Sequence, residues 1–426
     1  MGWTTYCPTV HGLPMSSNPA SMPTCPRTDV LIVGGGLAGL SLAVALGRAG
    51  IDVTVAERAS MDSTVDPGFD GRVTAIAYAS WRLLEAIGAW RHMEAHAQPI
   101  LDIRVTDGAA PVFLNFDHRA LGNEPFGYMV ENRHIRLGLL RTIQDLGTVH
   151  LQYPATVDGM EVHPGGVTAR LGGHGALRAS LVVAADGRKS PLRDAAGIRV
   201  LGHGYPETGI VTTIEHEKDH LGIAHERFLP AGPFAVLPIT GKRSSLVWSE
   251  KHHVAKAMVA LDDDSFNAEI SKRIEGFLGT VRAVGPRFSY PYAVHVAQRF
   301  SADRLALVGD AAHGMHPIAG QGLNLGWRDV AALAELLVDT ARLGLDMGSP
   351  LVLERYDRWR RIDTLTLTAA TDSLNTLFTN DVAPVRLLRD AGLAVVNRID
   401  PLKRFFMQHA RGTVGTLPRL LKGEAL

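Results

Sequence analysis

The chain has 426 residues, 46% of them apolar and 20% charged, which is an ordinary composition for a globular protein. This length exceeds what one hydrophobic core usually supports, so we expect two domains. Lysine plus arginine and aspartate plus glutamate both number 43, and this balance gives no reason to expect a nucleic-acid partner.

The N-terminal segment, residues 1–27, has neither hydrophobic periodicity nor the layout of a secretory signal. We expect a disordered tail here, and Met15 or Met22 is an alternative start. The two cysteines, Cys7 and Cys25, both lie in this segment and exclude a disulfide framework, which fits a reducing cytoplasm. No apolar run of the sequence reaches the length of a membrane span.

A glycine-rich turn joins a buried strand at residues 30–33 to an alanine- and leucine-rich helix at residues 37–49. The glycines have the spacing G-x-G-x-x-G, which allows a tight turn and close approach of the backbone to a pyrophosphate at the helix N-terminus. A second strand ends at Glu57, near the ~20-residue spacing of a carboxylate that binds a ribose hydroxyl. Together these features predict a dinucleotide site rather than an ordinary turn. The glycines are Gly34, Gly36 and Gly39.

The next segments alternate between the two expected domains. Arg72 precedes residues 75–87, whose apolar positions have helical spacing, and it is placed to reach a phosphate or carboxylate, with a solvated loop arginine as the alternative. Residues 101–105 and 111–116 predict strands of a separate sheet. Asn132 is expected to begin a helix of the first domain.

A second motif follows the buried strand expected at residues 181–185. Asp186 and Gly187 stand at its carboxyl end, where parallel sheets bind ligands. Ser190 and Pro191 then have the sequence of a helix N-terminus, with Ser190 as its cap. For Asp186 alone, a surface turn remains the alternative.

Residues 205–248 alternate between polar and apolar side chains and predict an antiparallel sheet. Laid over a cofactor, the sheet would supply an aromatic and apolar roof to the substrate site. The alternative is that the same side chains form the packed core of the sheet. The roof candidates are Phe228, Phe234, Pro238 and Trp248.

The third motif, residues 304–329, is the most specific. A buried strand ends at Asp310, and a glycine-interrupted loop then leads into a long helix. Gly320 and Gly322 let the backbone pass a flat ring, and the positive end of the helix suits the negative charge of a reduced flavin. His313 and His316 lack further ligands at metal-binding spacing, so we interpret them as structural or capping residues and expect no metal site.

The final segment, residues 381–426, mixes basic residues with apolar positions such as Leu393, Val396, Phe405 and Phe406. This composition suits either a helix pair at a membrane surface or ordinary helices that cover the first domain.

Taken in order, these motifs resemble the group A flavoprotein monooxygenases, which are the para-hydroxybenzoate-hydroxylase-like enzymes. Several stretches are more narrowly similar to the ubiquinone-biosynthesis hydroxylase family. These stretches are ERFLPAGP at 226–233, FAVLP at 234–238, GQGLNLG at 320–326 and ERYDRWRR at 354–361.

The resemblance implies an FAD site that runs along all three motifs. The glycine motif would hold the pyrophosphate and Glu57 the adenosine ribose, while Asp186 and Gly187 would contact both FAD and a transiently bound nicotinamide. Many relatives have Arg or Gln where this chain has Asn132. The implied cofactor-binding residues are Gly34, Gly36, Gly39, Glu57, Arg58, Arg72, Asn132, Asp186, Gly187, Asp310, Pro317, Gly320, Gly322, Leu323 and Asn324.

The resemblance also implies the reaction. NAD(P)H would reduce FAD, O₂ would form a flavin C4a-hydroperoxide, and its distal oxygen would be transferred to a phenol ring, here a polyprenylated ubiquinone precursor. The alternatives are a hydroxylase of a soluble phenol or another lipid, and a catalytically silent FAD-binding subunit of a biosynthetic assembly. A general base would activate the phenol, and Tyr292, His295 and Tyr205 are candidates by location only. Tyr292 is also a candidate substrate contact.

We therefore expect an α/β protein with a Rossmann-like FAD-binding domain, an inserted antiparallel-sheet substrate domain and a C-terminal helical segment. The protein would be cytoplasmic, with peripheral contact at the inner face of the cytoplasmic membrane as a further hypothesis. The expected FAD domain comprises residues 28–97, 131–197 and 296–380, the substrate domain 98–130 and 198–295, and the C-terminal segment 381–426.

Overall fold

A computed structural model describes residues 25–60, 65, 72–108, 113–316, 320–378 and 399–426. Parallel strands with almost wholly buried side chains form the centre of the first sheet. A hairpin of β9 (Val157–His163) and β10 (Gly166–Leu171) extends from β11, and β18 (Ser301–Ala302) closes the other edge. In order across the sheet, the parallel strands are β19 (Leu305–Leu307), β11 (Gly175–Ala184), β1 (Arg27–Val33), β2 (Val53–Ala56) and β8 (Val149–Gln152).

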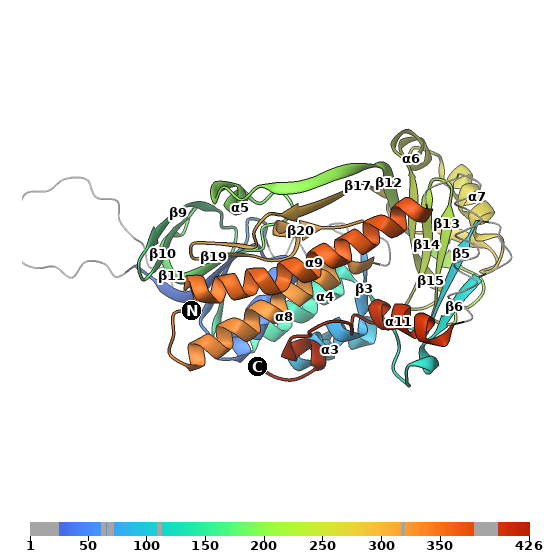
Figure 1. The fold of residues 1–426 in the computed structure, drawn as a ribbon. Helices are drawn as coiled ribbons and strands as arrows, with labels where there is room; N and C mark the ends of the chain where they lie inside the picture. Colours follow the sequence, from blue (N-terminus) through green and yellow to red (C-terminus); the bar gives the residue numbers. More distant parts are fainter. Residues whose placement is uncertain (1–24, 61–64, 66–71, 109–112, 317–319, 379–398) are drawn as a thin grey trace, which may run out of the picture.

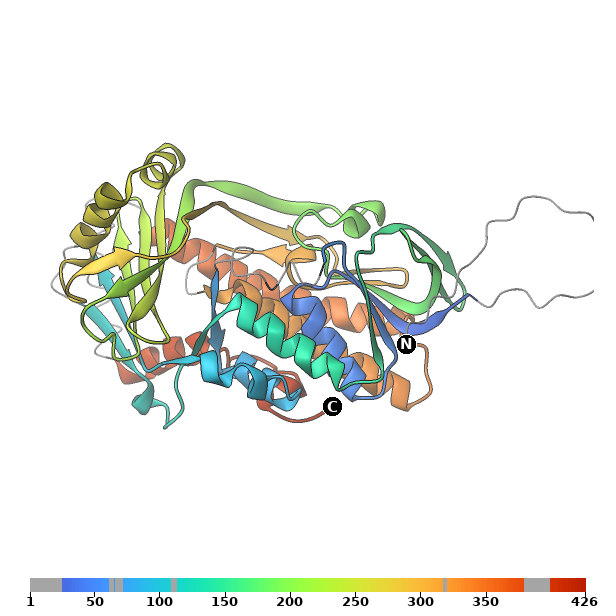
Figure 2. The same ribbon diagram turned by 180° about the vertical axis from the view of Figure 1, so that it is seen from behind.

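Helices pack together against this sheet. α1 (Leu37–Arg48) lies between α4 (Asn132–Gln144) and α8 (Gln321–Arg342), and α9 (Pro350–Phe378) packs on α8 (Figures 1 and 2). Gly50 follows α1 with φ +85°, the left-handed conformation expected at a helix end. The shorter helices of this region are α5 (Pro191–Ala195), η1 (Trp90–His92), η2 (Glu94–His96), η4 (Gly309–Ala311) and η6 (Arg419–Lys422).

A largely antiparallel sheet forms the opposite end of the molecule (Figure 1). α6 (His252–Val259) and α7 (Asp263–Ile274) cover one of its faces and bury a separate apolar core. β16 (Val281–Ala283) pairs with β12, and η3 (His118–Ala120) follows β6. In order, the strands are β20 (His313–Gly314), β17 (Phe288–Ala297), β12 (Val200–His216), β15 (Arg243–Lys251), β14 (Gly232–Ile239), β13 (Ile223–Leu229), β5 (Asp102–Asp107) and β6 (Phe113–Asp117).

The two ends are connected by long elements and by a small third sheet. The ribbon of β12 and β17 spans from one end to the other, and α9 runs beside it (Figure 1). The small sheet consists of β3 (Val73–Ala77), β7 (Gly127–Glu131) and β4 (Gln98–Ile100), and α3 (Tyr78–Ala86) follows β3. Residues of β3 and β7 form one apolar cluster with α11 (Asp400–Ala410) and with the sheet face opposite α7.

The architecture has the expected mixed α/β plan, and one local prediction is wrong. The helix expected over residues 75–87 begins at Tyr78, because residues 75–77 instead pair with β7 as part of β3. The small sheet also joins β3, from the predicted FAD domain, to strands from the predicted substrate domain, so it crosses the expected boundary at residue 98. Within the described residues, no helix is both long and apolar enough to cross a bilayer.

Candidate cofactor and substrate site

The predicted motif residues meet at the carboxyl edge of the parallel sheet. β19, β11, β1 and β2 are adjacent in that order, and they lead into Asp310, Asp186, Gly34 and Glu57 respectively. Open α/β sheets bind ligands at this edge, because the loops that follow neighbouring strands open there together.

The glycine loop has the shape of a phosphate cradle. A Cβ at Gly34, where φ is +110°, would lie 2.2 Å from the Ala185 carbonyl oxygen, and a Cβ at Gly39 would lie 2.1 Å from the Gly34 carbonyl oxygen. A Cβ at Gly36 would meet no described atom within 4 Å. Gly36 caps α1 without a side-chain hydrogen bond, so the first N–H groups of the helix face this open space. Free N–H groups and space above Gly36 fit a pyrophosphate.

Glu57 is held beside this loop by backbone donors. Its carboxylate accepts hydrogen bonds from the Gly35 N–H at 2.6 Å and from the Ala59 N–H at 2.8 Å. Buried Arg136 of α4, which the sequence analysis missed, donates to the Gly35 carbonyl oxygen at 2.8 Å. Arg58 is exposed next to Glu57.

Arg72 and Asn132 are joined at the start of β3 and α4. The Asn132 N–H donates to the Arg72 carbonyl oxygen at 3.0 Å. The side-chain oxygen of Asn132 accepts a hydrogen bond from the Thr74 hydroxyl at 2.6 Å. The Arg72 guanidinium lies 5.8 Å from the centre of the Tyr290 ring. The residue pair therefore lies where the two ends of the molecule meet.

Asp186 has one carboxylate oxygen available for a ligand. Burial raises the pKa of this carboxyl, and its Oδ2 accepts from the Leu192 N–H at 3.4 Å. Its Oδ1 is buried and has no hydrogen-bond partner among the described residues. Gly187 follows with φ +87°. A buried oxygen without a donor fits a ligand that supplies a hydroxyl.

The loop before α8 is fixed to β3 by Asn324. Its side chain accepts from the Ala77 N–H at 2.9 Å and donates to the carbonyl oxygens of Ala75 at 2.8 Å and Gly320 at 3.0 Å. Gly320 caps α8 in the left-handed conformation, and a Cβ at Gly322 would meet no described atom. The backbone therefore leaves room for a flat ring at the helix N-terminus. Leu323 is half-buried against the main core, and Pro317 lies outside the described residues.

A buried ion network supports the strand end that carries Asp310, whose side chain is exposed. Asp329 of α8 accepts from the Gly309 N–H at 3.0 Å, from the His313 ring at 2.6 Å and from Arg360 of α9 at 2.8 Å. Since Arg360 and His313 are themselves buried, the network is structural, as expected for His313. The sequence analysis missed Asp329 and Arg360.

The predicted roof residues are divided between two faces of the sheet. Phe234 and Trp248 are wholly buried, and the Trp248 ring lies 6.1 Å from Phe266 of α7, so these two belong to the core under the helices rather than to a roof. Pro238 is buried and shares the strand alternation of Phe234. Phe228 belongs to the cluster on the opposite face, which packs against β3 and β7.

Two of the three candidate bases contact His316, which lies next to the loop before α8. The ring centre of His316 is 4.6 Å from that of Tyr292 and 4.9 Å from that of Tyr205. Tyr292 is bonded to the Ser249 hydroxyl at 3.2 Å, and burial raises its pKa to about 12. The Tyr205 hydroxyl donates to Asp372 of α9 at 2.6 Å. The third candidate, His295, donates from Nε2 to the Asp310 carbonyl oxygen at 2.9 Å.

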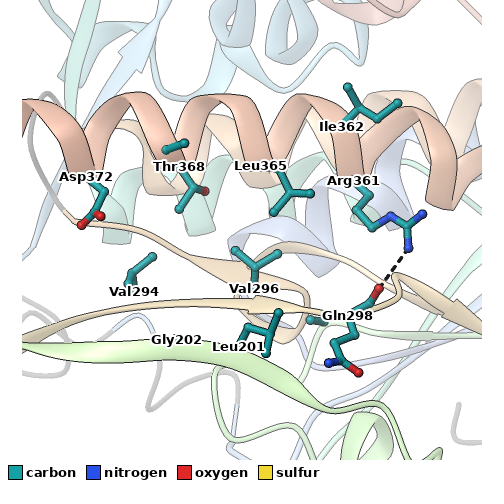
Figure 3. Close-up of a pocket in the computed structure, with 12 residues that line it drawn as sticks. Leu201, Gly202, Val294, Val296, Gln298, Arg361, Ile362, Leu365, Thr368 and Asp372 are labelled. Atoms are coloured by element: carbon teal, nitrogen blue, oxygen red, sulfur yellow. Dashed lines mark hydrogen bonds between the residues drawn. The ribbon is translucent and has the colours of Figure 1, made fainter.

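An apolar groove reaches Asp372, the residue that accepts the hydrogen bond of Tyr205 (Figure 3). It lies between α9 and the ribbon of β12 and β17, and its volume is about 750 Å³. Asp372 lies at one end, and at the other end Arg361 donates to the Gln298 carbonyl oxygen at 3.1 Å. The apolar walls include Leu201, Val294, Val296, Ile362 and Leu365.

Comparison with known proteins gives matches over almost the whole chain. Residues 27–363 match the FAD binding domain family. The chain is 49% identical to ubiquinone hydroxylase UbiL of Rhodospirillum rubrum, covering 97% of both chains. It is 34% identical to 3-demethoxyubiquinol 3-hydroxylase of Escherichia coli, over 90% of this chain and 98% of that one. The fold is similar to p-nitrophenol 4-monooxygenase PnpA from Pseudomonas putida, with a TM-score of 0.77 and 22% identity over 92% of this chain and 100% of that one.

Proposed function

Because the chain belongs to the FAD binding domain family and, within it, to the ubiquinone hydroxylases, we propose that it hydroxylates the ring of a polyprenylated phenol in ubiquinone biosynthesis. It would do so as an FAD-dependent monooxygenase that consumes NAD(P)H and O₂. Bound FAD supplies the redox chemistry that activates oxygen. The chain itself must bind the cofactor, orient the phenol and exclude water.

We assign the cofactor to the carboxyl edge of the parallel sheet. The open space at Gly36, the unpartnered Asp186 oxygen and the room beside Gly322 support this assignment. The predicted cofactor residues at these strand ends remain proposed contacts. Tyr292 and His316 are both buried with their ring centres 4.6 Å apart, and these two rings would help to exclude water from a substrate ring bound beside them.

The apolar groove is the observation that favours a prenylated phenol over a soluble phenol as the substrate. We propose that it holds the isoprenoid tail, with the phenol ring beyond the Asp372 end, near Tyr205. Its volume of about 750 Å³ falls within the range of pockets that bind small molecules. The groove is open to the surface, as a tail longer than the groove requires: Ile362 and Leu365 are 64% and 49% exposed.

The test compares Leu365→Arg in the groove with Leu351→Arg, an exposed position of α9 outside it. A charge at residue 365 would remove favourable burial of the tail, so KM for ortho-farnesylphenol should rise about tenfold, with little change for unsubstituted phenol. Leu351→Arg should behave as wild type. Equal KM values for all three proteins would reject the groove as the binding site of the isoprenoid tail. Hydroxylation of soluble phenols alone would reject a prenylated phenol as the substrate. FAD binding without any turnover by the wild type would indicate a silent scaffold subunit.

We also propose a cytoplasmic protein that touches the inner face of the membrane, and association with other enzymes of the pathway. A prenylated substrate resides in the bilayer, and Phe405 of α11 is 49% exposed although Met407 is buried in the cluster beneath. Flotation with anionic liposomes should carry wild type upward and Phe405→Ser less. Wild type that remains wholly at the bottom of the gradient would exclude the membrane contact.

A further inference from the structure

Glu226 is a carboxyl group on a mainly apolar sheet face, which it shares with buried Asp107 of β5. Its cross-strand neighbours are Val105 on β5 and Ala235 on β14, and Ala224 and Phe228 share its face of β13. Both of those β13 residues belong to the cluster that packs against β3 and β7. The sheet face that carries Glu226 is therefore turned toward the cofactor-binding end of the molecule.

The charged and aromatic neighbours of Glu226 along β13 lie on the other face. Arg227 pairs with Glu275 at the end of α7 at 2.7 Å, and His225 stacks on Phe277 at 4.3 Å. Among the described residues, the Glu226 side chain has no hydrogen bond and no ion pair. A carboxylate that is largely withdrawn from water and has no partner is unfavourable in its charged form, so an unpaired one indicates a site for a ligand or a proton.

The same apolar cluster connects Glu226 to the loop beside the cofactor. Ala75 of β3 packs against it, and a Cβ at Gly320 would lie 3.1 Å from the Ala75 Cβ. From the other side, the charge of Glu226 adds to burial in raising the pKa of Tyr292, which contacts His316. Glu226 is therefore close enough to Tyr292 to affect its pKa, and the apolar cluster on its face of the sheet reaches Ala75 beside the start of α8.

Burial alone raises the pKa of Glu226 to about 7. A general base works best when its pKa is near the working pH, because it is then both deprotonated and basic enough to take a proton. The side chain keeps some accessible surface, so a ligand can reach it. Other titratable and charged groups also face this side. Burial raises the pKa of Tyr292 of β17 and of Glu207 of β12. The further groups are Asp107 of β5, Tyr290 of β17, and Arg243 of β15, which pairs with Glu131 of β7.

We propose that Glu226 is the general base that receives the proton of the substrate's ring hydroxyl. In this step the phenolic O–H bond breaks, the proton moves to a Glu226 carboxylate oxygen, and the bonding electron pair remains on the phenol oxygen. The ring carbon that is attacked thereby becomes more electron-rich. The assignment rests on the proposed function, since it requires a phenolic substrate.

The test compares the FAD-loaded enzymes with Glu226→Gln and Glu207→Gln. Glu226→Gln should lower kcat with ortho-farnesylphenol by about 10²- to 10⁴-fold. The rise of kcat with pH near 7 should disappear in this variant, because the amide does not titrate in this range and cannot accept the phenol proton. Glu207→Gln should keep that rise. An ultraviolet difference spectrum of bound ortho-farnesylphenol should show phenolate in wild type and neutral phenol in Glu226→Gln.

The outcomes separate this assignment from the proposed function. Wild-type kcat and pH profile in Glu226→Gln, or loss of the pH rise only in Glu207→Gln, would overturn the role of Glu226. If wild type bound the phenol as phenolate but formed no hydroxylated product, the proposed function would fail. The spectra of wild type and Glu226→Gln would still test whether Glu226 accepts the phenol proton. A loss of FAD from Glu226→Gln would make the residue structural and would also overturn the proposal.

Discussion

Alanine at Gly36 and at Gly39 should have opposite effects, although the two glycines belong to one motif. A Cβ at Gly36 would meet none of the described atoms within 4 Å, and φ −70° with ψ 177° is favourable for alanine. Gly36→Ala should therefore leave the thermal stability of the apoprotein unchanged. A bound pyrophosphate would occupy that space, so the methyl group should weaken FAD binding by about 1–3 kcal/mol, or about 5- to 150-fold in Kd.

At Gly39 the methyl group collides with the protein itself. It would lie 2.1 Å from the Gly34 carbonyl oxygen and 3.2 Å from the Ala185 Cβ, so Gly39→Ala should destabilise the apoprotein by about 1–3 kcal/mol. Melting of both apoproteins and fluorescence titration with FAD separate the two effects. If Gly36→Ala bound FAD as tightly as wild type, the pyrophosphate would not lie above Gly36, and the reasoning would be refuted.

Two further predictions concern buried charges. Asp329→Asn should lower the free energy of unfolding in urea by about 3–5 kcal/mol, because it removes the wholly buried partner of Arg360. Asp363→Asn changes the more exposed partner of Arg360 and should have the smaller effect. Equal effects of the two substitutions would contradict the network. Burial and two nearby arginines lower the pKa of His225 to about 4, so the folded state resists its protonation, and stability should fall as the pH drops from about 6.5 toward 4. His225→Gln should lose less stability than wild type in melting experiments between about pH 7.5 and about pH 5, and identical losses would exclude this residue as a source of acid sensitivity.

The strand ends of the site were predictable because their signals are local. A short apolar run followed by glycine or aspartate specifies a strand and the turn after it within a few residues, as at Gly34, Asp186 and Asp310. Parallel pairing then places these turns at one edge, whatever the lengths of chain between them.

The remaining features depend on contacts between distant segments. The spacing of residues 75–77 fits a helix, but pairing with β7 makes them a strand. Alternation predicts that Phe234 and Trp248 share a face, and only the position of α7 decides that this face is the one turned away from the cofactor-binding end. Glu226 is visible in a family-like motif, yet its lack of a partner among the described residues depends on pairing with β5, which lies far earlier in the chain, as well as with the next strand, β14.

Mass spectrometry of quinone intermediates in cells that lack this gene tests the central claim most directly. The proposed function predicts accumulation of one prenylated phenol that is short of a single hydroxyl group, and re-expression of the wild-type chain should clear it. An unchanged quinone profile, with the purified protein still carrying FAD, would contradict a role in ubiquinone biosynthesis and would leave a flavoprotein with another substrate.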